Sequence, residues 1–413
     1  MAAEQKPRNI VIIGGGIIGS TTAYFMSHHE QFDRERDRIT LLEATKIAGG
    51  ASGKAGGLLA LWAYPSCLVP LSYRLHKELS DIHNGPERWG YRAVHCGQLD
   101  MYGLLPKSAK SNNPAHSASI PLQKRSGKAK SVPHATPRVP KDLDWVHADG
   151  IQAYDPMGDP STTAQVHPYQ FTTAMAQLAE ERGVRIVYGS ATKITQSETD
   201  GAVTAVTYIP KGTTEEQHLA ADTVVLTAGP WTRTIWPRAP ISALRAHSVT
   251  IQPTRPVSAY ALFTSISLPA SPKTRGSGSA KTATPEIYAR PNNEVYACGE
   301  GDTLIPLPTA TDLVQVDEAR CQEIVEQVGL ISEELRDGEV TARQACYLPN
   351  VSGGGGGGPM VGETGVKGLV MGAGHTCWGI QNAPGTGKCL SELVWEGEMK
   401  SARLGSLDPG KYM

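Results

Sequence analysis

The sequence predicts an α/β fold with two lobes, one built around a β-α-β unit at the start of the chain and the other around a β-rich mixed sheet. The chain has 413 residues, more than the roughly 250 to 300 at which a single hydrophobic core stops growing. Its pattern runs strand, helix, strand at the start, then helical and β-rich segments, and finally strand and helix. No repeat of fixed period is visible, so a single unit with two lobes is the simplest arrangement.

The first elements are a buried strand over residues 10–13, a glycine turn, and a helix over residues 20–26. In this turn Gly14 permits the tight bend and Gly16 lets a pyrophosphate approach the backbone. Gly19 then lets the helix pack close to the strand. The helix N-terminus is expected to face the phosphates of a dinucleotide.

A second strand, residues 39–42, ends in Glu43, the acidic partner expected for a ribose hydroxyl. This context predicts a Rossmann-type dinucleotide site; an ordinary tight turn with a solvated Glu43 is the alternative. The motif by itself does not separate FAD from NAD. The strand and turn over 223–231 and a glycine-rich strand-to-helix unit over 368–388 favour FAD, because an extended dinucleotide needs contacts from both ends of the chain.

Between these units, a helix is expected over 171–182 and a strand over 184–187. Three stretches have the composition of loops: residues 106–142, residues 269–285 and the glycine run 353–358. The first is basic, and a solvated insertion is a simpler explanation for it than a binding surface for an acidic partner.

Composition excludes several classes of protein. Lys plus Arg (39) nearly balances Asp plus Glu (40), so no overall field favours a nucleic acid or an anionic membrane, and a small-molecule partner is expected. The seven cysteines lack C-x-x-C spacing, which favours a reducing compartment over a disulfide framework. No His or Cys pair has zinc spacing, so no metal is expected. The first nine residues lack an apolar signal-peptide core, and we expect a cytoplasmic protein.

Several motifs together resemble the D-amino-acid oxidase superfamily, especially its glycine oxidase and sarcosine oxidase branches, and most closely a fungal branch associated with endosomal trafficking. The motifs are the turn Gly14–Gly19, Ala51–Gly57, His167–Tyr169, Thr227–Trp231, Tyr288–Pro291 and Gly374–Gly387.

This resemblance implies a fold in which a discontinuous FAD-binding domain is assembled from residues 1–60, 165–235 and 340–413. A β-rich substrate domain would then comprise residues 61–164 and 236–339. The resemblance also implies a reaction: the flavin accepts a hydride from the carbon of a C–N bond, an imine leaves, and dioxygen reoxidises the flavin to give hydrogen peroxide.

The resemblance also assigns residues to the cofactor. The ammonium of Lys54 would favour a negatively charged reduced flavin, although a solvated lysine is an equal alternative. Residues 385–387 are expected to open the final helix and to direct backbone N–H groups at the isoalloxazine carbonyl oxygens. The residues expected at FAD are Gly14, Gly16, Ile17, Ile18, Gly19, Glu43, Ala44, Ala51, Ser52, Gly53, Lys54, Ala55, Gly56, Gly57, Ala228, Gly229, Trp231, Gly374, His375, Gly379, Gly385, Thr386 and Gly387.

The sequence departs from the family where glycine oxidase-like members carry an arginine for the substrate carboxylate. Cys377 and Trp378 stand in that segment, which puts the carboxylate clamp in doubt. Arg343 lies near the other place where the family has such an arginine, and a structural ion pair is its alternative role. We expect Lys54, Cys377, Trp378 and Arg343 around the substrate.

Cys346 falls close to the position where sarcosine oxidase-like enzymes attach FAD covalently. A buried cysteine that acts as a small apolar group is the favoured alternative, so noncovalent FAD is expected. His247 is open to either a site role or a structural role.

The resulting hypothesis is an FAD-dependent oxidase of an amine or amino acid. A flavin dehydrogenase with another electron acceptor is one alternative. Another is a flavoprotein that serves as a regulatory or adaptor partner in vesicle trafficking, peripheral to endosomes.

Overall fold

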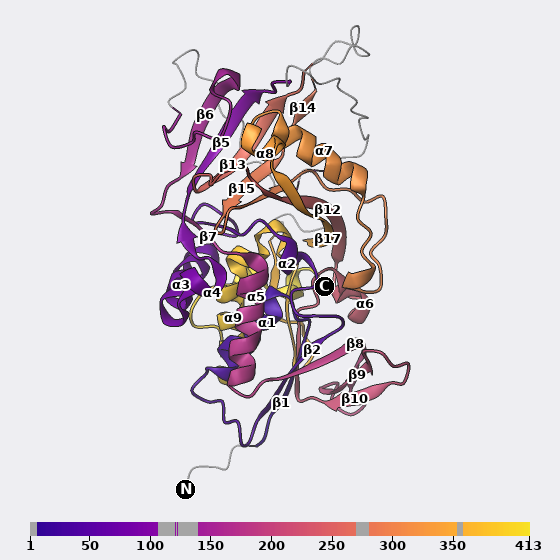
Figure 1. The fold of residues 1–413 in the computed structure, drawn as a ribbon. Coiled ribbons are helices and arrows are strands. Elements are labelled where there is room, and N and C mark those ends of the chain that lie inside the picture. Colours follow the sequence, from indigo (N-terminus) through magenta and orange to yellow (C-terminus); the bar gives the residue numbers. More distant parts are fainter. Residues whose placement is uncertain (1–5, 106–119, 121, 123–138, 270–280, 353–357) are drawn as a thin grey trace.

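The computed structural model describes residues 6–105, 120, 122, 139–269, 281–352 and 358–413. Most of the predicted loop 106–142, residues 270–280 and residues 353–357 of the glycine run lie outside the described residues. Two lobes lie one above the other in Figure 1, each with its own sheet. The α/β fold, with a Rossmann-type lobe and a β-rich lobe, is confirmed.

In the described part of the chain, the first sheet has eight strands. A parallel core of five strands lies at its centre, and antiparallel strands extend both edges. The near-continuous apolar sequence of its central strand is typical of a strand covered on both faces. The order is β10 (Gln217–Ala220), β9 (Val203–Pro210), β8 (Arg185–Gln196), β2 (Arg38–Glu43), β1 (Asn9–Ile13), β11 (Thr223–Leu226), β19 (Leu369–Ala373) and β18 (Met360–Glu363).

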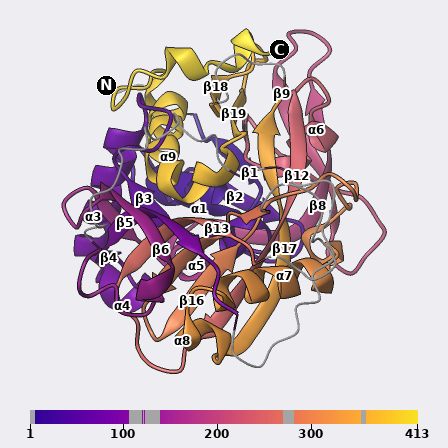
Figure 2. The same ribbon diagram turned by 90° about the horizontal axis from the view of Figure 1, so that it is seen from above.

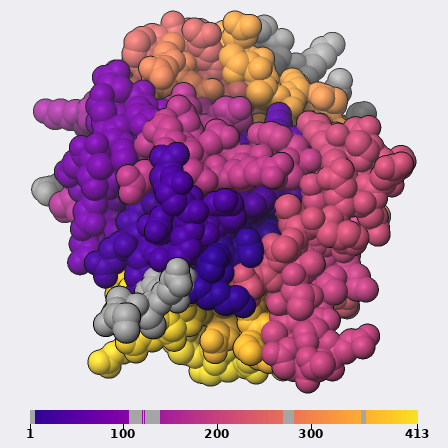
Figure 3. All heavy atoms as spheres, turned by 90° about the horizontal axis from the view of Figure 1, so that it is seen from below, coloured from indigo at the N-terminus to yellow at the C-terminus, as the bar shows by residue number. Residues whose placement is uncertain are grey.

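Several helices pack against this sheet. They are α1 (Ile17–Ser27), α3 (Val69–His83), α4 (Gly85–Trp89), α5 (Pro168–Glu181) and α9 (Gly379–Glu396). In the view from above, α9 lies beside α1, although the two are separated by most of the sequence (Figure 2). The view from below shows the N-terminal, central and C-terminal colours meeting on one face (Figure 3). The strands and helices predicted around the glycine turn are confirmed, with small shifts at their ends.

The second sheet, counted over the described residues, also has eight strands, and it is mainly antiparallel. Its path is β17 (Glu339–Val351), β12 (Ile241–Gln252), β16 (Glu294–Cys298), β15 (Glu286–Arg290), β13 (Tyr260–Ser267), β5 (His95–Tyr102) and β6 (Ile151–Gly158), with β14 (Thr282–Ala283) paired to β13. Helix α7 (Glu318–Gly329) packs on it, followed by the short α8 (Glu333–Arg336). A small sheet of β3 (Leu58–Ala60), β7 (Thr163–Gln165) and β4 (Arg92–Ala93) adjoins it.

Two elements do not follow the proposed division of the chain at residues 60, 165, 235 and 340. Strand β17 belongs by sequence to the last cofactor segment, yet it pairs along its length with β12 in the second sheet. Helix α3 belongs by sequence to the substrate segment, yet its apolar face packs with α9 in the core of the first lobe. The two elements depart from the division because local sequence patterns do not encode which distant segments form hydrogen bonds or pack together. The division of the chain into cofactor and substrate segments stays a proposal.

Candidate functional site

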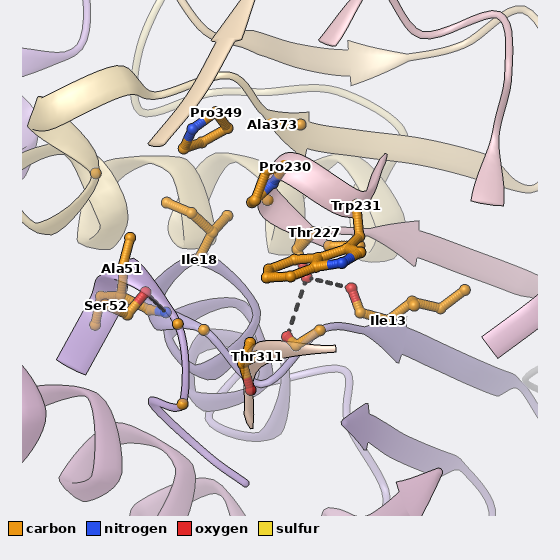
Figure 4. Close-up of a pocket in the computed structure, with 18 of the residues that line it drawn as sticks. Ile13, Ile18, Ala51, Ser52, Thr227, Pro230, Trp231, Thr311, Pro349 and Ala373 are labelled. Carbon is orange, nitrogen blue, oxygen red and sulfur yellow. Dashed lines mark hydrogen bonds between the residues drawn. The ribbon is translucent and has the colours of Figure 1, made fainter. Parts of the chain in front are cut away.

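A cavity of about 200 Å³ opens at the carboxyl ends of β1, β2, β11 and β19. Ligands of open α/β sheets bind in the crevice beyond the carboxyl ends of the strands. Figure 4 labels Trp231, Thr311, Ala51 and Ser52 among the residues that line this space. Its predicted residues come from four separate segments: Gly14, Gly16, Ile17, Ile18, Glu43, Ala44, Ala51, Ser52, Ala55, Ala228, Gly229, Trp231, Gly374, His375 and Gly379.

The glycine turn has the geometry that its residue types require. Gly14 has a φ of +109°, in the region that favours glycine, and its N–H donates to the carbonyl of Leu42 at 2.8 Å. A Cβ at Gly19 would lie 1.9 Å from the carbonyl oxygen of Gly14. The turn therefore holds the start of α1 directly against the end of β1.

Glu43 holds the same turn from the neighbouring strand. Its Oε2 accepts the N–H of Gly15 at 2.8 Å, and its Oε1 accepts the N–H and the hydroxyl of Thr45 at 2.9 and 3.1 Å. The side chain is buried, yet it lines the cavity. Glu43 thus joins the glycine turn to the end of β2, and a contact with a ribose would come in addition to this structural role.

The residues around the turn fit a dinucleotide. A Cβ at Gly16 would meet only the hydroxyl oxygen of Ser52, at 3.1 Å, so the backbone is bare toward the cavity. That hydroxyl accepts the N–H of Ile17 at 2.9 Å and fixes the start of α1. The first turn of α1 carries no acidic side chain. A helix N-terminus with no acidic side chain in its first turn suits a pyrophosphate.

The segment that contains Ala55 and Gly56 is hydrogen-bonded to a side chain of the second lobe. Arg290 donates to the carbonyls of Ala55 and Gly56, and its guanidinium also pairs with Glu294 at 2.8 Å. Gly56 lies directly against Tyr288, where a Cβ would be 2.0 Å from a ring carbon. The second sheet therefore positions the loop that was expected at the flavin.

The end of the chain differs from the prediction. Helix α9 begins at Gly379, so Gly385, Thr386 and Gly387 lie inside the helix and do not open it. They line neither cavity; instead Gly385 packs against Ser72 and Gly387 against the backbone of α1. The helix start that borders the cavity is Gly379–Ile380.

His375 lies just before this helix start and is buried. Its Nε2 is 2.9 Å from the hydroxyl of Thr386, and burial lowers its pKa to about 3. The imidazole is therefore neutral, and Thr386 acts by fixing its orientation. Among the described contacts, no hydrogen bond joins His375 to Cys377.

A second cavity of about 60 Å³ adjoins the first, and the two share Ala51, Ala55, Leu348, Cys377 and Ile380. Its remaining lining residues are Lys54, Gly56, Gly57, Leu58, Leu122, Ala246, Glu286, Tyr288, Tyr296, Cys298, Cys346 and Trp378. Three of the predicted substrate residues thus come together here, namely Lys54, Cys377 and Trp378. Among the described residues that line the two cavities there is no arginine.

The pKa values of Lys54, Cys346 and Cys377 in the second cavity are shifted in the direction that favours the neutral forms. Lys54 donates to the carbonyl of Ala345 at 2.8 Å, and burial lowers its pKa. Burial raises the pKa of Cys346 to about 11, although the nearby charge of Lys54 opposes the shift. Burial, reinforced by the charge of Glu286, raises the pKa of Cys377 to about 12. Neither thiol is a thiolate near neutral pH.

The structure does not bring Arg343 to this site. Its guanidinium donates to Gln322 at 2.7 Å and lies 3.6 Å from a carboxylate oxygen of Glu318, both on α7. These contacts match the alternative role of Arg343, a structural ion pair. His247 is also structural in its contacts: its Nε2 accepts the N–H of Asp317 at 3.0 Å in the buried charge cluster around Asp302.

Several lining residues were missed by the sequence analysis. Segments 189–191 and 309–311 carry no recognisable motif. Glu286 was not singled out by the sequence, although it begins the strand β15 that also carries the start of the motif Tyr288–Pro291. A tertiary contact, and not a local pattern, brings each of them to the site.

The chain is similar to known proteins over nearly its whole length. Residues 9–393 match the family model described as DAO, FAD dependent oxidoreductase. The chain is 34% identical to "Putative oxidoreductase TDA3" of Saccharomyces cerevisiae, covering 99% of this chain and 95% of that protein. It is 35% identical to "Putative oxidoreductase C1F5.03c" of Schizosaccharomyces pombe, covering 98% of each. Among solved structures, glycine oxidase of Bacillus cereus superposes with a TM-score of 0.67 at 18% identity over 95% of this chain and 96% of that one.

Proposed function

The chain belongs to the DAO family of FAD-dependent oxidoreductases, and on that premise we propose that it oxidises the C–N bond of an amine or amino acid and passes the electrons to dioxygen. One observation carries the proposal: the cavity that fits the cofactor shares lining residues with a smaller cavity that carries ionisable and aromatic side chains. A substrate in the smaller cavity would lie directly beside the flavin. The glycine oxidase structure supports the choice of a C–N substrate by analogy of fold.

FAD, when bound, supplies an acceptor for the hydride that leaves the substrate carbon. The residues of this chain would do the rest. The N-terminus of α1 would hold the pyrophosphate, Glu43 and Ala44 the adenosine side, and Ala51–Gly57 with the start of α9 the flavin side. The ammonium of Lys54, fixed by the carbonyl of Ala345, would stabilise negative charge beside the flavin. The buried rings of Trp378 and Tyr288 would exclude water.

We propose that the flavin is noncovalent. A cysteine attacks as its thiolate, and the buried Cys346, with its pKa raised to about 11, is mostly protonated at physiological pH. Its position in the smaller cavity is consistent with a lining role. The fold by itself does not distinguish an oxidase from a dehydrogenase that uses another electron acceptor. A role in endosomal trafficking likewise has no supporting feature among the described residues.

No helix in the described ranges combines the length and the apolar character needed to cross a bilayer. In the same ranges, no three His, Cys, Asp or Glu side chains gather as metal ligands would.

The test is a visible spectrum of the purified protein, followed by anaerobic titration with amines and amino acids. We expect flavin bands that bleach on addition of a substrate, return when air is admitted, and produce one hydrogen peroxide per substrate. Acid precipitation should release the flavin into the supernatant, and a coloured pellet would overturn the noncovalent proposal. Bleaching that air does not reverse would contradict the oxidase and favour a dehydrogenase.

A further inference from the structure

A segment between two elements of the second lobe reaches the cofactor cavity of the first lobe. Residues 303–316 lie between β16 and α7, and residues 309–311 line the larger cavity. We propose that residues 303–316 form a strap that belongs to the FAD site, and that the opening of this strap sets the rate at which FAD binds and leaves. The inference goes beyond the proposed oxidation, because it concerns the retention of the cofactor and not its chemistry.

Both ends of the strap are anchored in the second lobe. Asp302, directly before the strap, is buried, and its carboxylate pairs with Arg245 at 3.1 Å. Asp317, directly after the strap, caps the N-terminus of α7 with its side chain. Tyr347 of β17 holds the first part of the strap, since its hydroxyl donates to the carbonyl of Ile305 at 2.9 Å. These contacts fix the points where the strap leaves and rejoins the second lobe.

The middle of the strap is hydrogen-bonded to the first lobe. The indole N–H of Trp231 donates to the carbonyl of Pro308 at 2.6 Å. The hydroxyl of Thr311 is hydrogen-bonded to that of Thr45. Because Thr45 already donates to Glu43 at 3.1 Å, Thr311 is the donor in this bond. The strap is therefore linked through Thr45 to the carboxylate that holds the glycine turn.

The first lobe has small residues where the strap meets it. A Cβ at Gly49 would lie 2.8 Å from the hydroxyl oxygen of Thr311, and a Cβ at Gly50 would lie 3.5 Å from its methyl carbon. Both glycines line the larger cavity, as Thr311 does. An FAD molecule held in this cavity would therefore have the strap as one of its walls.

The strap has little buried surface to keep it closed. The structure describes every residue from 303 to 316, and none of them is buried. Segments with few buried contacts open locally at a low cost in free energy. With its ends anchored and its middle held by hydrogen bonds to Trp231 and Thr45, the strap can open in the middle while the second lobe keeps its fold.

The first test locks the strap with a disulfide. Thr45→Cys and Thr311→Cys together place two thiols where two hydroxyls are now hydrogen-bonded. After FAD has been bound, diamide oxidises the pair by accepting the two thiol hydrogens. Release of FAD is then followed by flavin fluorescence after dilution into flavin-free buffer. We expect the oxidised double variant to release FAD at least about tenfold more slowly than the reduced one, because release requires the open strap.

Dithiothreitol should restore the rate of the reduced double variant. The two single-cysteine variants are the controls for the oxidant, and each should release FAD at the same rate before and after treatment with diamide. Mass spectrometry verifies that the disulfide joins the two introduced cysteines.

The second test removes one hydrogen bond and keeps the shape of the side chain. Thr311→Val lacks the hydroxyl that donates to Thr45, so we expect it to release FAD about three- to tenfold faster than the unaltered protein. Thr303→Val is the matched control on the same strap. Thr303 is exposed and lies outside the lining of both cavities, so this variant should release FAD like the unaltered protein.

Equal rates of FAD release from the oxidised and the reduced double variant would overturn the inference, and so would equal rates from Thr311→Val and the unaltered protein. Should the double variant fail to bind FAD, the comparison of Thr311→Val with Thr303→Val still decides the question. FAD release is measured without a substrate. A protein that oxidises no amine but retains FAD through the strap would therefore refute the proposed oxidation and leave this inference intact.

Discussion

Glu43 illustrates how one side chain serves both the fold and the cofactor. Its two carboxylate oxygens accept three hydrogen bonds from Gly15 and Thr45 while the side chain borders the cavity. A glutamine keeps the shape, but its amide nitrogen would face an N–H donor. Removing one charge-assisted bond costs about 1.5 to 3 kcal/mol.

We therefore predict that Glu43→Gln weakens FAD binding by about tenfold or more and lowers the melting temperature of the apoprotein. FAD affinity can be measured by flavin fluorescence and stability by calorimetry. Glu198→Gln, in an exposed turn between β8 and β9, is the matched control and should change neither. Unchanged FAD affinity in Glu43→Gln would show that the turn keeps its shape without the carboxylate.

At the residue scale, the sequence was informative where the backbone imposes a residue type. Gly14 and Gly19 were predictable because a turn with positive φ and a helix in contact with a strand leave no room for a Cβ. Arg343 and Glu286 could not be placed, because charged side chains on strands carry no local signal of the face they meet. Arg343 faces α7, and Glu286 faces the cavity.

At the scale of elements, the contact between α1 and α9 supports the cofactor site. Pro384 lies inside α9 and has no N–H to donate to the carbonyl of Ile380, one turn earlier. His76 of α3 supplies that bond instead, with Nε2 at 3.0 Å from the oxygen. A third helix thus completes the hydrogen bonding of a helix that proline interrupts.

The contact between α1 and α9 also predicts the effect of a substitution at Gly387. A Cβ at Gly387 would lie 2.7 to 2.8 Å from the backbone of Thr21 and Thr22, so α1 and α9 would have to separate. We expect Gly387→Ala to lower the free energy of unfolding by about 1 to 3 kcal/mol and to weaken FAD binding, because α1 carries the glycine turn. Urea unfolding and FAD titration would measure both.

Gly405→Ala is the control for this substitution, because a Cβ there would meet nothing within 4 Å. It should stay within about 0.5 kcal/mol of the unaltered protein. Equal stability of the two variants would contradict the close packing of α1 against α9.

The position of these glycines also explains why the start of α9 was predicted wrongly. Three small residues after a proline have the pattern of a helix start, and glycine in a helix interior is costly. Here their small size is required by two neighbouring helices, α1 and α3, which a local pattern does not contain.

At the scale of the whole molecule, buried histidines couple stability to pH. Burial lowers the pKa of His76 and His247 to about 4 and that of His375 to about 3. For His247 the neighbouring charges of Arg245 and Arg320 act in the same direction. Because each folded pKa lies below the unfolded value of 6.5, the unfolded chain binds more protons at low pH. The contribution of these neutral histidines to the free energy of unfolding is therefore complete above pH 6.5 and is lost as the pH falls toward 4.

We predict a loss of roughly 2 kcal/mol per histidine between pH 7 and pH 5. Carboxylates with lowered pKa, such as Asp37 and Glu392, act mainly below this window. The measurement is denaturant unfolding at both pH values for the unaltered protein and His76→Gln, whose amide can still donate to Ile380. The variant should lose less stability than the unaltered protein, and parallel losses would refute a buried neutral His76.

Local sequence determined the start of the Rossmann unit, the acidic end of β2 and the α/β class, because tight turns, strand burial and helix contacts restrict which residues fit. The tertiary structure decided the rest. In that structure β17 lies in the second sheet and Gly385–Gly387 lie inside α9. Arg343 contacts α7, and Glu286 lines the smaller cavity. These features depend on which distant segments pack together. That choice is set by the free energy of the whole core and leaves no signature in any short stretch of chain.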